Sequence, residues 1–288
     1  MNFVDSHCHI LAEDENRYPR APLGGKQSAW AGSRPVTAES LLERMDECGI
    51  TQAVLVQATT AYGYDNSYVL DSARRRPDRF VAVGTFDPLA DDAPGRLSQG
   101  LADGLGGVRL FTTGSTIAEQ GEWFADPTTD PFWSAAGELG VPVCLQLRLA
   151  EAAAPLRDLL SRFPEVTILL DHCGYPDVAG SPARAGDELA RLAEHPGLHL
   201  KLTHRTLEPL QAAGAQATAF LEPVLAAFGA ERIAWGSNCP AAEQPLNALV
   251  ALATDVLSRV GAADRAEIFS GTSRRLYKGL TASGAMAR

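Results

Sequence analysis

Eight short runs of apolar, often β-branched residues recur along this chain, and amphipathic helical stretches separate them. This alternation is typical of repeated βα units, in which a helix follows each strand and the strands pair in parallel. Eight such units in 288 residues favour a single-domain (β/α)8 (TIM) barrel over an open doubly wound sheet. The expected strands are residues 3–6, 53–57, 80–85, 107–110, 141–146, 166–171, 198–202 and 232–235.

Capping residues and loop lengths refine this picture. Thr37 is a favoured helix N-cap and Gly49 a favoured C-cap, so we expect a helix between them. Two connections, residues 11–36 and 111–130, are longer than the usual βα loop, and we expect both to lie over the active-site face. Without a linker or an internal repeat, residues 1–288 are expected to form one domain, with residues 281–288 as a flexible tail.

The charge balance limits the partners of this chain. Lys and Arg number 25 against 35 Asp and Glu, a formal charge of −10, so we expect no nucleic-acid partner. No stretch is apolar over the roughly 18 residues that suggest a membrane span, and no basic leader precedes the first strand. The five cysteines form no CxxC pair, as is typical of free thiols. We therefore expect a cytoplasmic protein, and its many arginines suit a small anionic ligand.

Polar residues at the ends of the expected strands carry the most functional information, because a barrel builds its active site there. His7 and His9 lie two residues apart, so their rings project to the same face, and His172 follows the sixth strand. Imidazoles in this arrangement can hold a metal ion or polarise a carbonyl group. The structural alternative is a polar strand end with a hydrogen-bonded histidine. The other polar residues at strand ends are Gln57, Arg109, Gln146, Arg148, His204, Arg205 and Asn238.

Three sequence blocks carry a family resemblance. They are Val-Asp-Ser-His-Cys-His-Ile at residues 4–10, Leu-Leu-Asp-His-Cys-Gly at 169–174 and Trp-Gly-Ser-Asn-Cys-Pro at 235–240. In this order they resemble the amidohydrolase superfamily. More narrowly, they resemble its branch that contains 2-pyrone-4,6-dicarboxylate lactonase, L-fuconolactonase and sulfomuconolactone hydrolase. The resemblance spans nearly the whole chain.

The resemblance implies a distorted (β/α)8 barrel that hydrolyses a lactone or a related carbonyl compound. It implies that His7, His9 and His172 surround the substrate carbonyl, that an aspartate after the eighth strand activates water, and that arginines bind the substrate carboxylates. Some members of the branch work without a metal, and Gln146 stands here where metal-dependent relatives have a histidine. We therefore expect no required cofactor, with one Zn²⁺ held by the three histidines as the alternative.

The chain departs from the branch at the position of that aspartate, where it has Asn238. A neutral amide neither accepts a proton nor binds a cation well. Three explanations stay open: an introduced isosteric change that traps substrate, a native asparagine with His7, His9 or His172 as the base, or a reaction other than hydrolysis. We favour a native asparagine, because Asn also suits the turn formed by Ser-Asn-x-Pro.

Arginines near the expected active-site mouth predict how substrate binds. Arg109 and Arg148 close separate strands, and loop arginines lie within reach, which favours a local anion clamp on an acidic protein. For each loop arginine the alternative is a surface salt bridge. The loop arginines are Arg17, Arg20 and Arg205, and further candidate contacts are Gln57, Gln146, Tyr62, Tyr64 and His204, with Trp30 as a cover over the ligand.

Three functions are compatible with these residues. The first is a lactonase in which water attacks the carbonyl of a cyclic ester while imidazoles stabilise the oxyanion. The second is a Zn-dependent non-oxidative decarboxylase of an aromatic or muconate acid. The third is a base-deficient relative that binds a small anion without hydrolysis, which Asn238 favours. We expect the first, in small-molecule catabolism, as a monomer or a homo-oligomer with no membrane partner.

Overall fold

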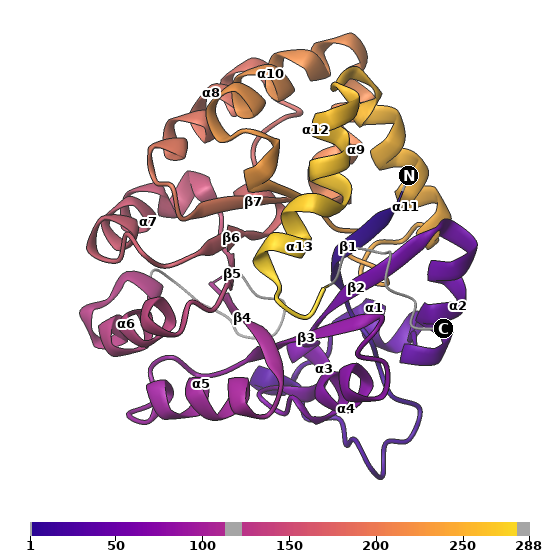
Figure 1. Ribbon diagram of the computed structural model, residues 1–288, viewed down its shortest axis with the longest axis vertical. Coiled ribbons are helices and arrows are strands. Elements are labelled where there is room, and N and C mark those ends of the chain that lie inside the picture. The colour runs from indigo at the N-terminus through magenta and orange to yellow at the C-terminus, as the bar shows by residue number, and fades with distance from the viewer. Residues whose placement is uncertain (1, 113–122, 281–288) are drawn as a thin grey trace.

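The computed structural model describes residues 2–112 and 123–280. Eight strands pair in parallel in sequence order, and helices surround them (Figure 1). All eight predicted strands are present, and the (β/α)8 barrel is confirmed. The predicted tail, residues 281–288, and residues 113–122 of the second predicted long loop lie outside the described residues. The strands are β1 (Phe3–Cys8), β2 (Ile50–Val56), β3 (Phe80–Thr85), β4 (Leu105–Phe111), β5 (Val143–Gln146), β6 (Ile168–Leu170), β7 (Leu198–Leu202) and β8 (Ile233–Trp235).

Local sequence signals set the helix boundaries. The Thr37 hydroxyl accepts a hydrogen bond from the backbone N–H of Ser40 at 3.1 Å. Gly49 follows the helix with a φ of 70°, a left-handed conformation that glycine adopts without the steric cost of a Cβ. The predicted helix between Thr37 and Gly49 is therefore confirmed as α2. The helices are α1 (Ala29–Ser33), α2 (Ala38–Cys48), α3 (Thr59–Tyr62), α4 (Ser67–Arg75), α5 (Ala93–Ala102), α6 (Asp130–Leu139), α7 (Leu149–Arg162), α8 (Pro182–Ala190), α9 (His204–Ala213), α10 (Ala217–Phe228), α11 (Leu246–Val256), α12 (Ala262–Ala266) and α13 (Thr272–Leu276). Within the two described segments, no helix is both long and apolar enough to cross a membrane.

The barrel closes between β8 and β1. Cys8 and Cys239 form a parallel bridge. Two backbone hydrogen bonds of 2.7 Å accompany it, from the Asn238 N–H to the His7 carbonyl and from the His9 N–H to the Cys239 carbonyl. An open doubly wound sheet leaves its two edge strands apart, so that alternative is excluded. Ring closure therefore brings together the polar residues that follow β1 and β8.

The barrel interior is filled by apolar side chains at one end. Alternate residues of β2 and β3, namely Val54, Val56, Val81 and Val83, pack in one cluster with Tyr277. Tyr277 follows α13, which lies across the strands in Figure 1. Because this end is filled, the space for chemistry lies at the other end, where the carboxyl ends of the strands meet.

The first predicted long loop lies over those carboxyl ends. Residues 11–36 contain α1, and Ser28 and Trp30 from this segment line the cavity described below. The expected position of this loop over the active-site face is therefore confirmed.

Candidate active site

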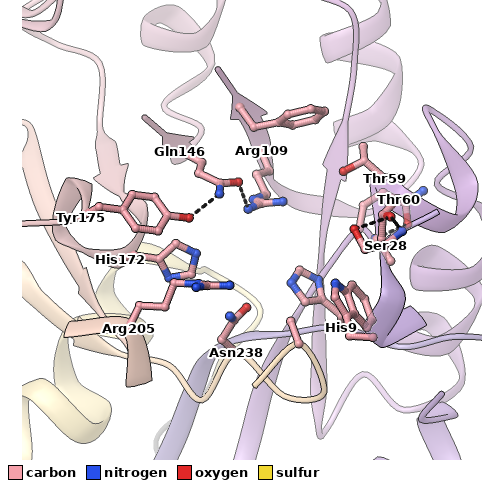
Figure 2. A pocket seen from close by; sticks show the side chains of 15 residues that line it. His9, Ser28, Thr59, Thr60, Arg109, Gln146, His172, Tyr175, Arg205 and Asn238 are labelled. Carbon is pink, nitrogen blue, oxygen red and sulfur yellow. Dashed lines mark hydrogen bonds between the residues drawn. The ribbon is translucent and has the colours of Figure 1, made fainter. Parts of the chain in front are cut away.

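A cavity of about 120 Å³ lies at the carboxyl ends of the strands. Figure 2 shows polar side chains from several elements converging on it, as in a site for a small molecule. Sequence-predicted residues line it: His9, Gln57, Arg109, Gln146, His172, Arg205 and Asn238, with the predicted cover Trp30. Residues that sequence analysis missed also line it, among them Ser28, Thr59, Thr60, Phe111 and Tyr175.

His9 is a neutral imidazole that presents an acceptor nitrogen. Its Nδ1 lies 2.8 Å from the Val56 carbonyl oxygen. A carbonyl only accepts hydrogen bonds, so Nδ1 carries the proton and Nε2 keeps its lone pair. The ring stacks on Trp30 with centroids 5.4 Å apart, and burial lowers the pKa of His9 to about 4. At neutral pH, His9 can therefore accept a proton from water.

His172 lies in a turn with left-handed backbone. His172, Cys173 and Tyr175 have φ angles of 57°, 53° and 56°, a conformation that costs about 1 kcal/mol or more for a residue with a Cβ. The His172 Nδ1 is 2.7 Å from the Thr203 hydroxyl, and burial lowers the pKa of His172 well below its usual value. The turn thus holds a second neutral imidazole against the cavity, and such conformations are typical of functional sites.

Asn238 serves both the turn after β8 and the cavity. Its φ of 59° is left-handed, which Asn adopts more readily than most residues. The turn role expected from the sequence is therefore confirmed. Asn238 is 3% exposed and lines the cavity together with His9. A neutral amide in this position can orient a water but does not take its proton.

A buried group of four side chains, which we call the Lys201 cluster, lies in the barrel interior. It consists of His7, Cys144, Asp171 and Lys201, all 0% exposed. The Lys201 Nζ lies 3.0 Å from Asp171 Oδ1, 3.0 Å from Cys144 Sγ and 3.3 Å from His7 Nδ1. Burial opposes ionisation, yet the cations around Asp171, Lys201 foremost, hold the pKa of this carboxyl well below its usual value. Burial likewise opposes the Lys201 charge, but Asp171 raises the pKa of Lys201. The cluster therefore contains an ion pair beside His7.

His7 lies one layer deeper than His9 and His172. Its ring centroid is 4.9 Å from that of His9 and 5.3 Å from that of His172. The side chain does not line the cavity, and burial lowers the pKa of His7 well below its usual value. The structure thus brings the three predicted imidazoles together, with His7 behind the other two.

Two arginines line the cavity with different neighbours. The Arg109 Nε lies 2.9 Å from Asp171 Oδ2, and a terminal nitrogen of Arg109 donates to Gln146. The Arg205 guanidinium stands 6.0 Å from the ring centroid of Tyr175 and has no carboxylate partner in the part of the chain that the structure describes. A guanidinium without a counter-ion beside a cavity suits an anionic group on a ligand.

Other arginines predicted to bind substrate do not line the cavity. Arg20 donates to the Tyr62 hydroxyl at 2.7 Å. The Arg148 side chain is 56% exposed, and Arg17 pairs with Asp71 at 2.8 Å. Arg17 and Arg20 lie in the long loop after β1, and Arg148 directly precedes α7. The rule that places active-site residues at strand ends does not predict the course of the loops that follow the strands.

Tyr64 and His204 also lie outside the cavity lining. Tyr64 is 37% exposed, whereas His204 begins α9 and is buried, which lowers its pKa to about 4. Lys201 is not among the residues predicted from the sequence, although its position in the sequence could have indicated a role. It is one of only three lysines and interrupts the apolar strand β7. A charge inside an apolar strand needs a buried partner.

The imidazoles as placed do not form a metal site. In residues 2–112 and 123–280, no three His, Cys, Asp or Glu side chains are grouped to hold a metal ion. Asn238 carries no charge, and the carboxylate of Asp171 is paired with Lys201 and Arg109. A divalent cation would face two buried cations with no ligand carboxylate to offset them. The three predicted histidines therefore do not fit the Zn²⁺ considered as the alternative.

Comparisons with known proteins agree on the barrel. The family model described as Amidohydrolase matches residues 4–279. No curated protein matches the chain. A solved amidohydrolase from Burkholderia multivorans with bound HEPES is 22% identical, and the match covers 96% of this chain and 99% of that one with a TM-score of 0.74. Another crystal form of the Burkholderia multivorans amidohydrolase holds zinc.

Two further solved structures have the same fold. A putative 2-pyrone-4,6-dicarboxylic acid hydrolase from Pseudomonas putida is 23% identical, over 97% of this chain and 98% of that one, with a TM-score of 0.74. The 5-carboxyvanillate decarboxylase from Sphingomonas paucimobilis is 16% identical, over 97% of this chain and 99% of that one, with a TM-score of 0.65. At these identities the likeness shows the fold and leaves the reaction open.

Proposed function

Because this chain belongs to the amidohydrolase family, we propose that it is a hydrolase that opens a lactone, or a related cyclic ester, of a small carboxylic or dicarboxylic acid. One observation carries this proposal. A single cavity holds the neutral imidazole of His9, which presents an acceptor nitrogen, and the guanidinium of Arg205, which has no carboxylate partner in the described residues. The first can accept a proton from water, and the second can bind a carboxylate.

The reaction begins with a water between His9 and Asn238. The water oxygen attacks the carbonyl carbon of the lactone, and a water proton passes to His9 Nε2, which leaves a tetrahedral oxyanion. Each donor that is aligned with this oxyanion contributes about 3 kcal/mol. Collapse of the oxyanion breaks the ring C–O bond, and the proton on His9 moves to the leaving alkoxide oxygen. The product is a hydroxy acid, and His9 is neutral again.

The arginines give the proposal its substrate class. Arg109 is already paired with Asp171 and hydrogen-bonded to Gln146, whereas Arg205 is exposed at the cavity. A substrate carboxylate that reaches Arg205 forms a charge-assisted hydrogen bond, and such bonds fix orientation as well as affinity. Lactones that carry a free carboxylate are therefore the favoured substrates over neutral lactones.

The names of similar structures support this choice. Two of them, from Pseudomonas putida and Acinetobacter baumannii, are named as putative or probable 2-pyrone-4,6-dicarboxylic acid hydrolases. A pyrone dicarboxylic acid is a lactone with two carboxyl groups. The decarboxylase with the same fold makes release of carbon dioxide the main competing reaction.

The test is proton release from a panel of lactones with and without a free carboxylate, with and without a chelator. We expect turnover of carboxylated lactones by the wild type. His9→Gln should lower the rate by about 10² to 10⁴-fold, the usual worth of a general base. Arg96→Gln is the matched control, since that side chain is 53% exposed on α5 and lies outside the cavity. If the wild type opens no lactone, hydrolysis is the wrong reaction. Carbon dioxide release from aromatic acids would then favour the decarboxylase, and binding without turnover would favour a non-hydrolytic relative.

A further inference from the structure

Lys201 makes two hydrogen bonds and one ion pair inside the barrel. An ammonium group carries three N–H bonds and no lone pair. Cys144 Sγ at 3.0 Å and His7 Nδ1 at 3.3 Å accept hydrogen bonds from it, and Asp171 Oδ1 forms an ion pair with it at 3.0 Å. The side chain is 0% exposed, so bulk solvent does not replace these acceptors. The lysine therefore acts on His7 as a fixed donor.

This contact determines which nitrogen of His7 carries the proton. Because Lys201 only donates, Nδ1 of His7 must accept, and the proton of the neutral ring lies on Nε2. Asp171 Oδ1 is farther from the same Nδ1, at 3.5 Å. That carboxylate selects the opposite tautomer when no ammonium faces the ring. With Lys201 in place, a proton on Nδ1 would point at an N–H bond of the lysine.

We propose that Lys201 is a positioning residue that holds His7 in the Nε2–H tautomer, so that His7 offers a hydrogen-bond donor at Nε2 and is not a metal ligand. His9 has the reverse arrangement, because the Val56 carbonyl holds its proton on Nδ1. The two histidines of the His-Cys-His segment thus have opposite tasks. His7 offers a donor at Nε2, and His9 offers an acceptor at Nε2.

The donor of His7 has no acceptor within residues 2–112 and 123–280. Its Nε2 is buried and has no hydrogen-bond partner among the described residues. A buried donor without a protein partner needs one from a water, an ion or a ligand. The rings of His9 and His172, which line the cavity, lie 4.9 and 5.3 Å from the His7 ring. The base role of His9 rests on the proposed function, whereas the tautomer of His7 does not.

The same tautomer accounts for the poor fit of a metal ion. A histidine that ligates through Nε2 usually donates its Nδ1–H to a carboxylate or a carbonyl. In the Lys201 cluster an ammonium takes the place of that acceptor, so His7 Nε2 offers a proton where a metal needs a lone pair. Removal of the ammonium leaves Asp171 as the nearest partner of Nδ1.

Nuclear magnetic resonance tests the tautomers directly. Two-bond 1H–15N spectra of protein labelled with [15N]histidine report which nitrogen is protonated, and His7→Gln assigns the His7 signals. We expect Nε2–H for His7 and Nδ1–H for His9 in the free protein. A proton on His7 Nδ1 overturns the proposal. No lactone enters this experiment, so its failure is distinct from the failure of the proposed function.

Two substitutions of Lys201 separate its donor role from its charge. Lys201→Gln and Lys201→Met both remove the charge, but only the glutamine keeps an N–H donor toward His7. We expect the wild-type tautomer in Lys201→Gln and the Nδ1–H tautomer in Lys201→Met. Identical tautomers in the two variants would contradict a positioning role. If Lys201→Met does not fold, the wild-type spectrum still decides the matter.

Zinc titration by calorimetry gives a second readout. Lys201→Met should bind one Zn²⁺ about ten-fold or more tightly than the wild type, in line with the effect of acceptors behind metal ligands. His7→Gln in the Lys201→Met background should abolish that gain. Equal zinc affinity in Lys201→Met and the wild type overturns the link between Lys201 and metal exclusion.

Discussion

Asp5 lies at the junction of β1 and β8 with no exposed surface. One carboxylate oxygen accepts from the backbone N–H of His7 at 3.0 Å and of Ser237 at 2.8 Å, and the other accepts from the Ser237 hydroxyl. Burial, partly offset by these hydrogen bonds, raises the pKa of Asp5 from 3.8 to about 6. An amide keeps the geometry of these contacts, because its oxygen accepts from both N–H groups and its nitrogen donates to the hydroxyl. Asp5→Asn is therefore expected to fold with the same junction.

The sign and size of the effect follow from proton linkage. The pKa of Asp5 is higher in the folded state, so its contribution to stability is complete below about pH 4 and is lost as the pH rises through about 6. Two pKa units correspond to about 3 kcal/mol, of which about 2 kcal/mol falls between about pH 4.5 and about pH 7. Asn has no proton to lose. The stability of Asp5→Asn relative to the wild type should therefore rise by about 2 kcal/mol over that interval.

Urea unfolding of both proteins at a series of pH values measures this difference. Subtraction of the wild-type curve cancels the contributions of the buried histidines, which both proteins share. Asp91→Asn, a change at an exposed aspartate in the loop after β3, is the matched control and should give a flat difference curve. If the stability difference between Asp5→Asn and the wild type stays flat or falls as the pH rises, burial does not raise the pKa of Asp5.

Other predictions concern the cavity. Arg205→Gln should raise KM for carboxylated lactones by about 10 to 100-fold, since a hydrogen bond to a charged group contributes about 1.5 to 3 kcal/mol, and should leave KM for neutral lactones unchanged. The acidic limb of kcat/KM should lie at about pH 4, because activity needs neutral His9 and is lost as the pH falls through its lowered pKa; a limb near pH 6.5 would exclude His9 as the base. Asn238→Asp places a carboxylate beside His9 and should move that limb to higher pH, which a pH–rate profile detects. Thr203→Val removes the hydroxyl that holds His172 and should lower stability by about 1 kcal/mol in urea unfolding; an unchanged midpoint would show that the hydrogen bond contributes nothing net.

The strands and the strand-end residues of the site could be predicted from sequence because both follow local rules. Apolar runs mark buried strands, and β3 and β7 have the predicted bounds. The rule that barrel chemistry lies at the carboxyl ends predicted the place of His9, His172 and Asn238 in one cavity. These residues lie within a few positions of a strand, so the barrel itself fixes where they stand.

Residues that depend on contacts distant in sequence could not be placed in this way. Arg20 donates to Tyr62, and the half-exposed Arg148 stands over the Tyr175 ring, because the loops that carry them follow their own contacts. The alternation of β7 gives no sign that Lys201 meets Asp171 and His7 inside the barrel. The position of the proton on His7 depends on the contact with Lys201, which is distant in sequence, so no local pattern predicts it.

The closure of the barrel between β8 and β1 also affects how the enzyme loses activity on heating. β8 has three residues, and the amides of His9 and Asn238 supply backbone bonds across this junction. Local opening there separates two side chains of the cavity while the other strand pairs stay intact. Amide hydrogen exchange at these two positions should thus report fluctuations that inactivate the protein below the temperature of global unfolding.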